Sequence, residues 1–221
     1  MQKSVNKKLI VSIILTSLAL LGFLAFMILV LCDYSFKIDN FNVVVANNRN
    51  SFWNGFFEIF THIGSFYTLA ILAFIAVILL WFVKKDKRMS VFYAVCFAVV
   101  CISNYVIKII VRRARPDLMI ISETGYSFPS GHSMMSFAFF MLLIHFVWIT
   151  LKNKPLKISL TIIFSVLIEM IGFSRIYLGV HYLTDIIAGW LITFVLVGLC
   201  LMMYNSKLFR KKDGIKSEES N

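Results

Sequence analysis

Six long apolar runs constrain this chain more than any other feature of its sequence. A helix needs about 20 apolar residues to cross the hydrocarbon layer of a bilayer, and backbone polar groups in lipid must be satisfied within the protein. The alternating segments of a membrane barrel are not seen in the sequence. We therefore predict one all-α membrane domain over residues 1–221 with six transmembrane helices. We expect these helices at about residues 9–31, 57–83, 89–111, 131–151, 158–174 and 184–204, and the outer boundary of the fifth is open.

The composition supports this class of protein. The chain is 60% hydrophobic and 15% charged, whereas soluble domains carry about 25% charged residues. The first apolar run lacks a small-residue cleavage site and is longer than the core of a signal peptide, so we expect a retained helix. The cysteines show no metal-binding or redox spacing, and we expect them to be packing residues without a disulfide. They are Cys32, Cys96, Cys101 and Cys200.

The basic residues predict an orientation, because cytoplasmic loops carry an excess of Lys and Arg. Both termini are therefore expected in the cytoplasm, with residues 1–8 and the basic tail 205–221 on that side and the tail disordered. The basic residues behind the net charge of +11 lie in the connections between the spans, where they set the orientation of the chain in the membrane. We therefore expect no nucleic-acid partner. Fifteen of the 22 basic residues fall in residues 1–8, 84–88, 152–157 and 205–221.

The other seven basic residues are predicted on the outer side, where the same rule does not favour them. Cations concentrated there suit an anion, because Arg offers a planar fork that matches phosphate oxygens and Lys offers a point charge. A basic cluster by itself is more often an interfacial anchor, so the cluster needs further support. The seven are Lys37, Arg49, Lys108, Arg112, Arg113, Arg115 and Arg175.

The stretch Pro129-Ser130-Gly131-His132 begins the fourth span. The N-terminus of a helix presents free N–H groups and the positive end of the helix dipole, which favour an anion. Gly131 lets the backbone approach closely, Ser130 adds a hydroxyl, and His132 adds a titratable proton. Pro and Ser also begin many helices, but that interpretation leaves the histidine unexplained.

A third outer group consists of Ser174-Arg175, His181 and Asp185. His181 and Asp185 are four residues apart and share one face if the segment is helical. A carboxylate that accepts the Nδ1–H of an imidazole fixes the tautomer and leaves Nε2 free as a nucleophile or base. The pair is weak evidence alone, but it gains weight beside two phosphate-binding patterns on the same membrane face.

The three groups together resemble the signature of the type-2 phosphatidic acid phosphatase (PAP2) superfamily, in particular its compact bacterial members. All eleven signature positions are filled in order, and the resemblance covers nearly the whole chain after the first span. The matching residues are Lys108, Arg115-Pro116, Pro129-Ser130-Gly131-His132, Ser174-Arg175, His181 and Asp185.

The resemblance implies a membrane phosphatase with its site at the extracytoplasmic face and with no metal or other cofactor. Lys108, Arg115 and Arg175 would hold the phosphate oxygens, helped by Ser130 and the amide of Gly131. These cations would neutralise the charge that Mg²⁺ balances in other phosphoryl transfers. No Asp, Glu and His cluster with metal-binding spacing stands near them in the sequence.

The resemblance also implies roles for the two outer histidines and for the carboxylate. His181 would attack phosphorus and become a phosphohistidine, while Asp185 would orient its ring. His132 would protonate the leaving oxygen and then activate the hydrolytic water.

The expected substrate is a lipid phosphate or diphosphate in the bilayer, because the site lies at headgroup depth and the outer loops are short. We favour undecaprenyl diphosphate, since an outer site suits recycling of a carrier released there; phosphatidylglycerophosphate or phosphatidic acid is the alternative. A lipid-phosphate transporter would need the cations but not two histidines. A vanadate-dependent haloperoxidase has a similar site, but those enzymes are soluble. No oligomeric state is predicted.

Four outer features are left with open roles. The segment 33–56 is expected to form a short interfacial helix or an ordinary loop. His62 could line the mouth of the site with Glu58. Glu169 is costly inside the fifth span unless it is paired, with Lys108 or Arg112 as the expected partner, or lines a water-filled cleft. Arg112 and Arg113 lie outside the signature.

Overall fold

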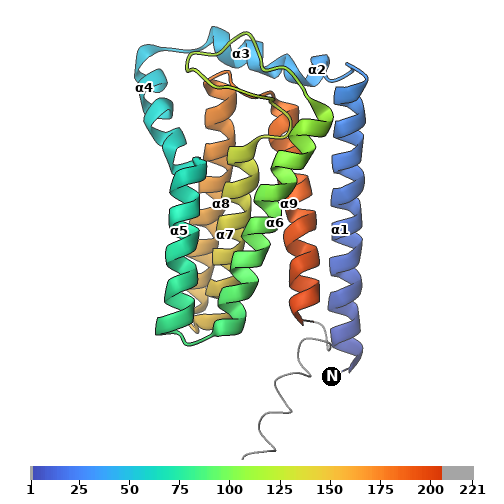
Figure 1. Cartoon of the computed structure of the whole chain (residues 1–221), viewed down its shortest axis with the longest axis vertical. Coiled ribbons are helices and arrows are strands. Elements are labelled where there is room, and N and C mark those ends of the chain that lie inside the picture. The colour runs from blue at the N-terminus through green and yellow to red at the C-terminus, as the bar shows by residue number, and fades with distance from the viewer. Residues whose placement is uncertain (1, 206–221) are drawn as a thin grey trace, which may run out of the picture.

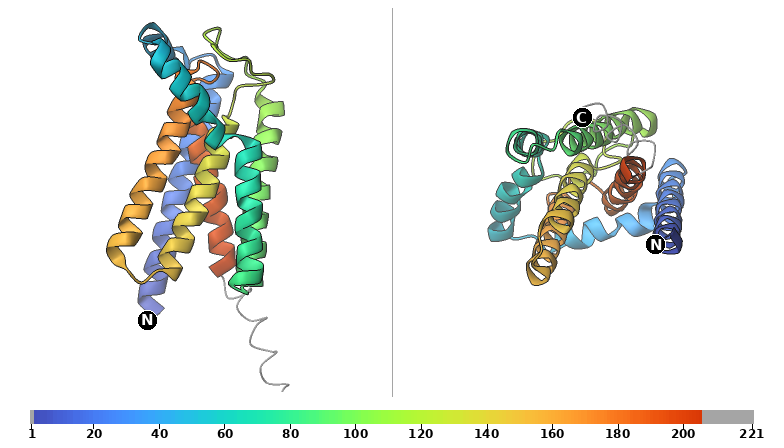
Figure 2. Two further views of the ribbon diagram at one scale, coloured as in Figure 1. Left: turned by 90° about the vertical axis from the view of Figure 1, so that its left-hand side faces the viewer. Right: turned by 90° about the horizontal axis from the view of Figure 1, so that it is seen from below.

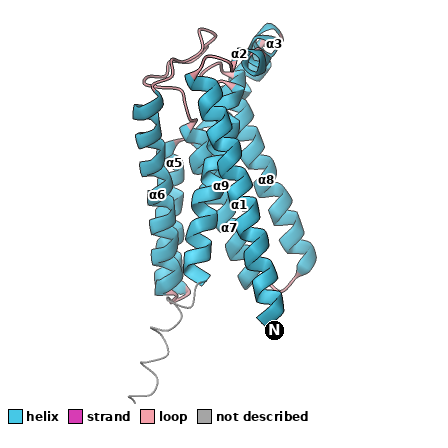
Figure 3. Cartoon of the chain, turned by 90° about the vertical axis from the view of Figure 1, so that its right-hand side faces the viewer, coloured by secondary structure: helices cyan, strands magenta, loops and turns pink. Residues whose placement is uncertain are grey.

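The computed structural model describes residues 2–205, and the ordered elements within this range are all helices (Figures 1 and 3). Six of them are long and apolar enough to cross a membrane, which confirms the predicted fold class. The predicted disordered tail, apart from Asn205, lies outside the described residues. The long elements are α1 (Gln2–Leu31), α5 (Phe66–Ile78) continued by the π-helical turn η2 (Leu79–Val83), α6 (Lys87–Val111), α7 (Gly131–Thr150), α8 (Lys154–Tyr177) and α9 (Leu183–Asn205).

Helix α7 is the centre of the bundle, in contact with α5, α6, α8 and α9, while α1 packs on α9 at the periphery (Figure 2). Half of the spanning window of α7 is buried, a larger share than in any other span. Small residues allow this close packing, and Ser133, Ser136 and Ala138 are fully buried. Gly172 of α8 serves the same purpose, because a Cβ there would lie 2.6 Å from Trp190 of α9.

The second span begins later than its apolar run, so the predicted start at residue 57 is wrong. Residues Ser51–Phe60 form a separate helix, α4, which is followed by a 3₁₀ turn, η1 (Thr61–Gly64). Ser65 is extended and caps the next helix, where its Oγ accepts a hydrogen bond from the amide of Thr68. This cap divides a continuously apolar stretch, and hydropathy alone cannot detect it.

The fifth span also differs from the prediction at its outer end. Helix α8 continues past residue 174 and ends at Tyr177, so that Arg175 lies in its last turn. The polar outer stretch therefore contributes part of a helix as well as a loop.

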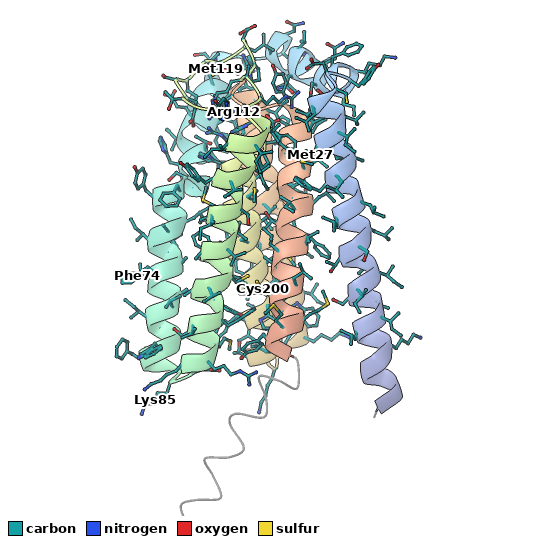
Figure 4. All side chains as sticks on the ribbon, turned by 45° about the vertical axis from the view of Figure 1, so that its right-hand side comes forward. Met27, Phe74, Lys85, Arg112, Met119 and Cys200 are labelled. Atoms are coloured by element: carbon teal, nitrogen blue, oxygen red, sulfur yellow. The ribbon has the colours of Figure 1, made fainter. Side chains whose placement is uncertain are left out.

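The surface of the bundle is apolar and the charged connections lie at its two ends. Phe74 and Phe82 on the α5–η2 element are 65% and 69% exposed, as expected for side chains that face lipid (Figure 4). The α5–α6 and α7–α8 connections lie at the same end as the start of α1, and Lys85 marks that end in Figure 4. The loops predicted to be extracytoplasmic, marked by Arg112 and Met119, lie at the opposite end of the bundle, which we call the outer end.

The segment after α1 forms three short helices that cross the outer end of the bundle (Figure 1). They are α2 (Phe36–Asp39), α3 (Phe41–Asn47) and α4, in place of the single helix or loop expected there. Phe52 and Trp53 on α4 are exposed, which fits the expected interfacial contact with lipid.

The inner side of this segment holds the loop between α8 and α9. Asn42 is 1% exposed. Its side-chain Nδ2 donates to the backbone carbonyl of His181 at 2.7 Å, and its Oδ1 accepts from the backbone amide of Leu183 at 3.2 Å. Arg49 donates to the carbonyls of Tyr177 and Leu118 at 2.7 and 2.8 Å. The three short helices thus support the outer loops from above.

Replacement of Asn42 by Ala should destabilise the protein, because it removes both hydrogen bonds from buried backbone groups. Each buried group left without a partner costs about 1–3 kcal/mol. Thermal unfolding of the purified protein in detergent measures the effect, with Asn47→Ala on the exposed side of α3 as the matched control. Equal melting temperatures for the two variants would show that Asn42 does not support the loop.

Candidate functional site

The eight residues predicted to form the site all lie at the outer end of the bundle. They come from the end of α6, the loop 112–130, the start of α7, the end of α8, the loop 178–182 and the start of α9 (Figures 1 and 4). The fold therefore brings together residues that are up to 77 positions apart in the chain, from Lys108 to Asp185. The eight are Lys108, Arg115, Ser130, Gly131, His132, Arg175, His181 and Asp185.

His181 is held between a carboxylate and a guanidinium group. Its Nδ1 lies 3.3 Å from Oδ2 of Asp185, and its Nε2 lies 3.3 Å from Nη1 of Arg115. A guanidinium can only donate hydrogen bonds, so this contact favours the tautomer with the proton on Nδ1 and an unprotonated Nε2. Burial and the nearby cations, Lys108 first, hold the pKa of His181 well below its ordinary value and so favour the neutral ring.

Asp185 is fully buried and both of its oxygens are used. Oδ2 faces His181 and also accepts from the amide of Tyr182 at 3.0 Å. Oδ1 accepts from Nη1 of Arg113 at 2.6 Å. Arg113, a residue outside the predicted set, is therefore the charge partner of Asp185.

Arg115 and Arg175 share the carboxylate of Glu123, which lies in the loop between α6 and α7. Glu123 accepts from Nη2 of Arg175 and lies 3.7 Å from Nη2 of Arg115. Arg175 is 1% exposed and also donates to Oγ1 of Thr61 at 2.8 Å. Its buried Nε has no partner among the described atoms, so one donor of the fork is free for an anion.

Lys108 lies on the same side of the site and faces the loop. Its ammonium donates to the carbonyls of Tyr126 and Ser127, the latter at 3.2 Å. The charges of Arg115, Asp185, Glu123 and Arg175 all act on it. The three predicted cations are thus grouped around one position.

The N-terminus of α7 is packed closely against its neighbours. Ser130 is the N-cap of the helix; its Oγ accepts from the amide of Ser133 at 3.4 Å, and its own amide donates to the carbonyl of Asp185 at 3.2 Å. A Cβ on Gly131 would lie 3.2 Å from Oδ1 of Asn104, so a glycine fits this close approach. The first turn of α7 is therefore fixed directly to the start of α9.

His132 follows in the first turn of α7 and is partly exposed. Its ring makes no hydrogen bond within the described part of the chain, and Arg175, Arg115 and His181 are all within electrostatic range of it. His62 on η1 is also within electrostatic range of His132, whereas Glu58 is exposed on α4. His62 therefore lies near the site, as proposed from the sequence, but Glu58 makes no contact with it that the described residues show.

The predicted pairing of Glu169 is wrong. Its side chain is exposed on α8 and forms no ion pair with Lys108 or Arg112 in the described structure. The helical period explains this, because Glu169 lies on the lipid-facing stripe with Val166 and Phe173, which are exposed too. Separately, residues 2–205 contain no group of three or more His, Cys, Asp or Glu side chains that could hold a metal ion.

Sequence reasoning missed several residues that complete the site. The main ones are Arg113, Asp39, Asn42, Thr61 and Glu123, which contact the predicted residues or their loops. Arg113 carried a usable signal, because it is a cation on the outer side that the topology rule does not explain. The others lie in outer segments whose position depends on the tertiary fold.

The fold and the site define a class of helical membrane protein with a group of cations and two histidines at one end of the bundle. A family model described as the PAP2 superfamily matches residues 87–209, which is more than half of the chain. The chain belongs to the PAP2 superfamily.

Curated relatives carry related names. The chain is 37% identical over 102 residues to phosphatidylglycerophosphatase B of Bacillus subtilis, covering 42% of this chain and 49% of that protein. It is 30% identical over 123 residues to undecaprenyl-diphosphatase of Sulfolobus acidocaldarius, covering 52% and 54%. The chain thus spans about half the length of the curated relatives that it matches.

Two solved structures share the fold. The crystal structure of the transmembrane PAP2-type phosphatidylglycerolphosphate phosphatase of Bacillus subtilis matches with a TM-score of 0.73 and 27% identity, over 84% of this chain and 94% of that one. The crystal structure of LpxE of Aquifex aeolicus matches with a TM-score of 0.56 and 24% identity, over 76% and 94%. The second likeness concerns the fold alone.

Glu123→Gln should make anions bind more tightly, because Glu123 satisfies guanidinium groups that a bound phosphate would also need. Its removal leaves two cations without their carboxylate partner, and we expect the inhibition constant for inorganic phosphate to fall about tenfold, equivalent to ~1.4 kcal/mol. Asp117→Asn, an exposed acid in the same loop, is the matched control. An unchanged or weaker affinity for phosphate would show that Glu123 does not compete with an anion.

Proposed function

We propose that this protein is a lipid phosphatase that hydrolyses a lipid phosphate or diphosphate at the outer membrane face through a phosphohistidine on His181. The observation that carries the proposal is the setting of this ring, with Nδ1 toward Asp185 and Nε2 toward Arg115. A neutral nitrogen with a fixed tautomer beside a cation that binds phosphate is arranged for nucleophilic attack on phosphorus.

In the first step, Nε2 of His181 forms a bond to phosphorus while the bond from phosphorus to the leaving oxygen breaks. The imidazole becomes a cation, which the carboxylate of Asp185 stabilises through Nδ1–H. Water then attacks the phosphohistidine, inorganic phosphate leaves, and His181 returns to its neutral form. Positioning and charge stabilisation supply most of the rate in such transfers.

Three cations stabilise the charge on the transferred group. We assign Lys108, Arg115 and Arg175 to the non-bridging oxygens, together with the Ser130 hydroxyl and the amide of Gly131. The buried, partly unpaired guanidinium of Arg175 supports this role. Preorganised donors aimed at developing charge are commonly the largest contribution to catalysis of this kind.

His132 is assigned as the acid and then the base. It would give its proton to the leaving oxygen in the first step and take a proton from the attacking water in the second. Its position in the first turn of α7, near both arginines and free of hydrogen bonds to the described residues, supports this assignment.

The site is proposed to face away from the cytoplasm. The connections that contain residues 84–88 and 152–157 are rich in lysine and lie at the end of the bundle opposite the site. Since basic connections favour the cytoplasmic side, the site end is the outer one.

Undecaprenyl diphosphate is the proposed substrate, because an outer site suits a lipid carrier released at that face. The name of the Sulfolobus relative supports this choice. The names of the Bacillus subtilis relative and of the Bacillus subtilis crystal structure favour phosphatidylglycerophosphate as the second candidate.

The proposal is tested by phosphate release from the purified protein in detergent or nanodiscs. Undecaprenyl diphosphate, phosphatidylglycerophosphate and phosphatidic acid are compared, each with and without excess EDTA. We expect turnover of at least one lipid, unchanged by EDTA because protein cations neutralise the phosphate, and no turnover by His181→Ala. His145→Gln, in the inner half of α7, is the control. Release of no phosphate from any lipid, or full activity of His181→Ala, would refute the function.

The effect of His132→Ala should depend on the leaving group. General acid catalysis contributes about 10²–10⁴-fold, and it matters most when a poor leaving group departs. A monophosphate such as phosphatidic acid expels an alkoxide, whereas a diphosphate expels a stable phosphate ester. In single-turnover formation of the phosphohistidine, we expect a much larger loss of rate on phosphatidic acid. Equal losses on both lipids, with chemistry rate-limiting, would contradict the role of His132.

The orientation is tested with a single cysteine in residues 117–127 in a background without the native cysteines. An impermeant thiol reagent should label it on intact cells, because this loop is at the site end of the bundle. A cysteine in the 84–86 turn is the matched control and should react only after lysis. The reverse pattern would place the site in the cytoplasm.

A further inference from the structure

Arg113 contacts the carboxylate that faces His181, and among the described residues it makes no direct contact with His181. Its Nη1 donates to Oδ1 of Asp185 at 2.6 Å and to Oγ1 of Thr184 at 2.7 Å. The opposite oxygen of Asp185, Oδ2, faces His181. Arg113 therefore acts on the imidazole only through Asp185.

The second nitrogen of the same fork binds a second buried carboxylate. Nη2 of Arg113 donates to Oδ2 of Asp39 and to Oγ of Ser35 at 2.9 Å. Asp39 lies on α2 and is 6% exposed, and its Oδ1 accepts from both the amide and the hydroxyl of Thr184. Asp39, Arg113 and Asp185 form a continuous chain of charges, which we call the Asp–Arg–Asp chain.

We infer that Arg113 and Asp39 are positioning residues for the phosphohistidine reaction: Arg113 fixes the carboxylate of Asp185, and Asp39 balances the charge of Arg113. This inference rests on the proposed function. The Asp–Arg–Asp chain carries two negative charges and one positive charge. A net negative charge therefore faces His181, whose ring becomes a cation when it is phosphorylated.

The charge balance explains why a second carboxylate is needed. Without Asp39, Arg113 and Asp185 would form a neutral pair and would stabilise an imidazolium less. Without Arg113, two buried carboxylates would lie close together with no cation between them, a costly arrangement. Burial lowers the pKa of Arg113, but Asp185 and Asp39 outweigh burial and raise it above the ordinary value.

The shape of the arginine is also required. A planar fork can bind two carboxylates in fixed directions, whereas a lysine offers a single point charge. The guanidinium lies 3.8 Å above the ring of Tyr182, next to His181 in the chain, and this contact further restricts it. Helix α2 thereby gains a direct connection to the catalytic loop.

The experiment compares kcat and KM for Arg113→Gln, Asp39→Asn and the variant with both changes in the purified full-length protein. Undecaprenyl diphosphate and phosphatidic acid serve as substrates. We expect kcat to fall about 10- to 100-fold, which is the loss seen when a residue that holds a metal ligand in place is removed. KM should change little, because neither residue touches phosphate. Arg112→Gln and Asp33→Asn are neighbouring exposed controls, and both should keep the wild-type kcat.

A double-mutant cycle with Asp185→Asn separates this role from general structural damage. If Arg113 acts through Asp185, Arg113→Gln should cause little further loss of kcat in the Asp185→Asn background. Losses that multiply in full, or a rise in KM with an unchanged kcat, would overturn the inference.

Asp39→Asn keeps Arg113 in place and serves if Arg113→Gln does not fold. A wild-type kcat for folded Asp39→Asn would overturn the inference even then.

The two proposals, the phosphatase function and the Asp–Arg–Asp chain, fail in different ways. A wild-type protein that releases no phosphate from any lipid contradicts the proposed function, whereas an active protein that tolerates Asp39→Asn contradicts only the Asp–Arg–Asp chain.

Discussion

The buried carboxylate of Asp185 is the constraint on which the outer end of this protein depends. A fully buried carboxylate at the start of an apolar helix is costly unless it is paired and hydrogen-bonded. Its partners come from two loops: Arg113 from the loop after α6, and His181 and the amide of Tyr182 from the loop after α8. These contacts fix the imidazole, and they also fix how the loops meet.

The short outer helices gain a function from this constraint. Their exposed aromatic side chains face the membrane surface, while Asp39, Asn42 and Arg49 hold the loops of the site from the inner side. In a bundle surrounded by lipid, the hydrophobic effect contributes little to the association of helices. Polar contacts at the outer end are therefore suited to fix the site where packing alone is a weak constraint.

Much of the fold and the predicted site follows from the sequence, because each depends on local signals. The six spans follow from apolar length, and the histidines and cations follow from spacing at helix ends. The rest depends on tertiary contacts. The cap at Ser65 divides an apolar run that hydropathy treats as continuous. The pairing predicted for Glu169 fails because its position on the helix turns its side chain toward lipid. Arg113 is visible in the sequence as an unexplained cation, but its partner Asp39 is 74 residues away in the chain.

The most direct test of the account is the detection of the covalent intermediate. The wild-type protein is mixed with a lipid whose terminal phosphate carries ³²P, quenched within the first turnover in alkali, and analysed by mass spectrometry. The account predicts a phosphoryl group on His181 that is stable in alkali and lost in acid. A label on another residue, or full turnover with no labelled protein at any quench time, would contradict it.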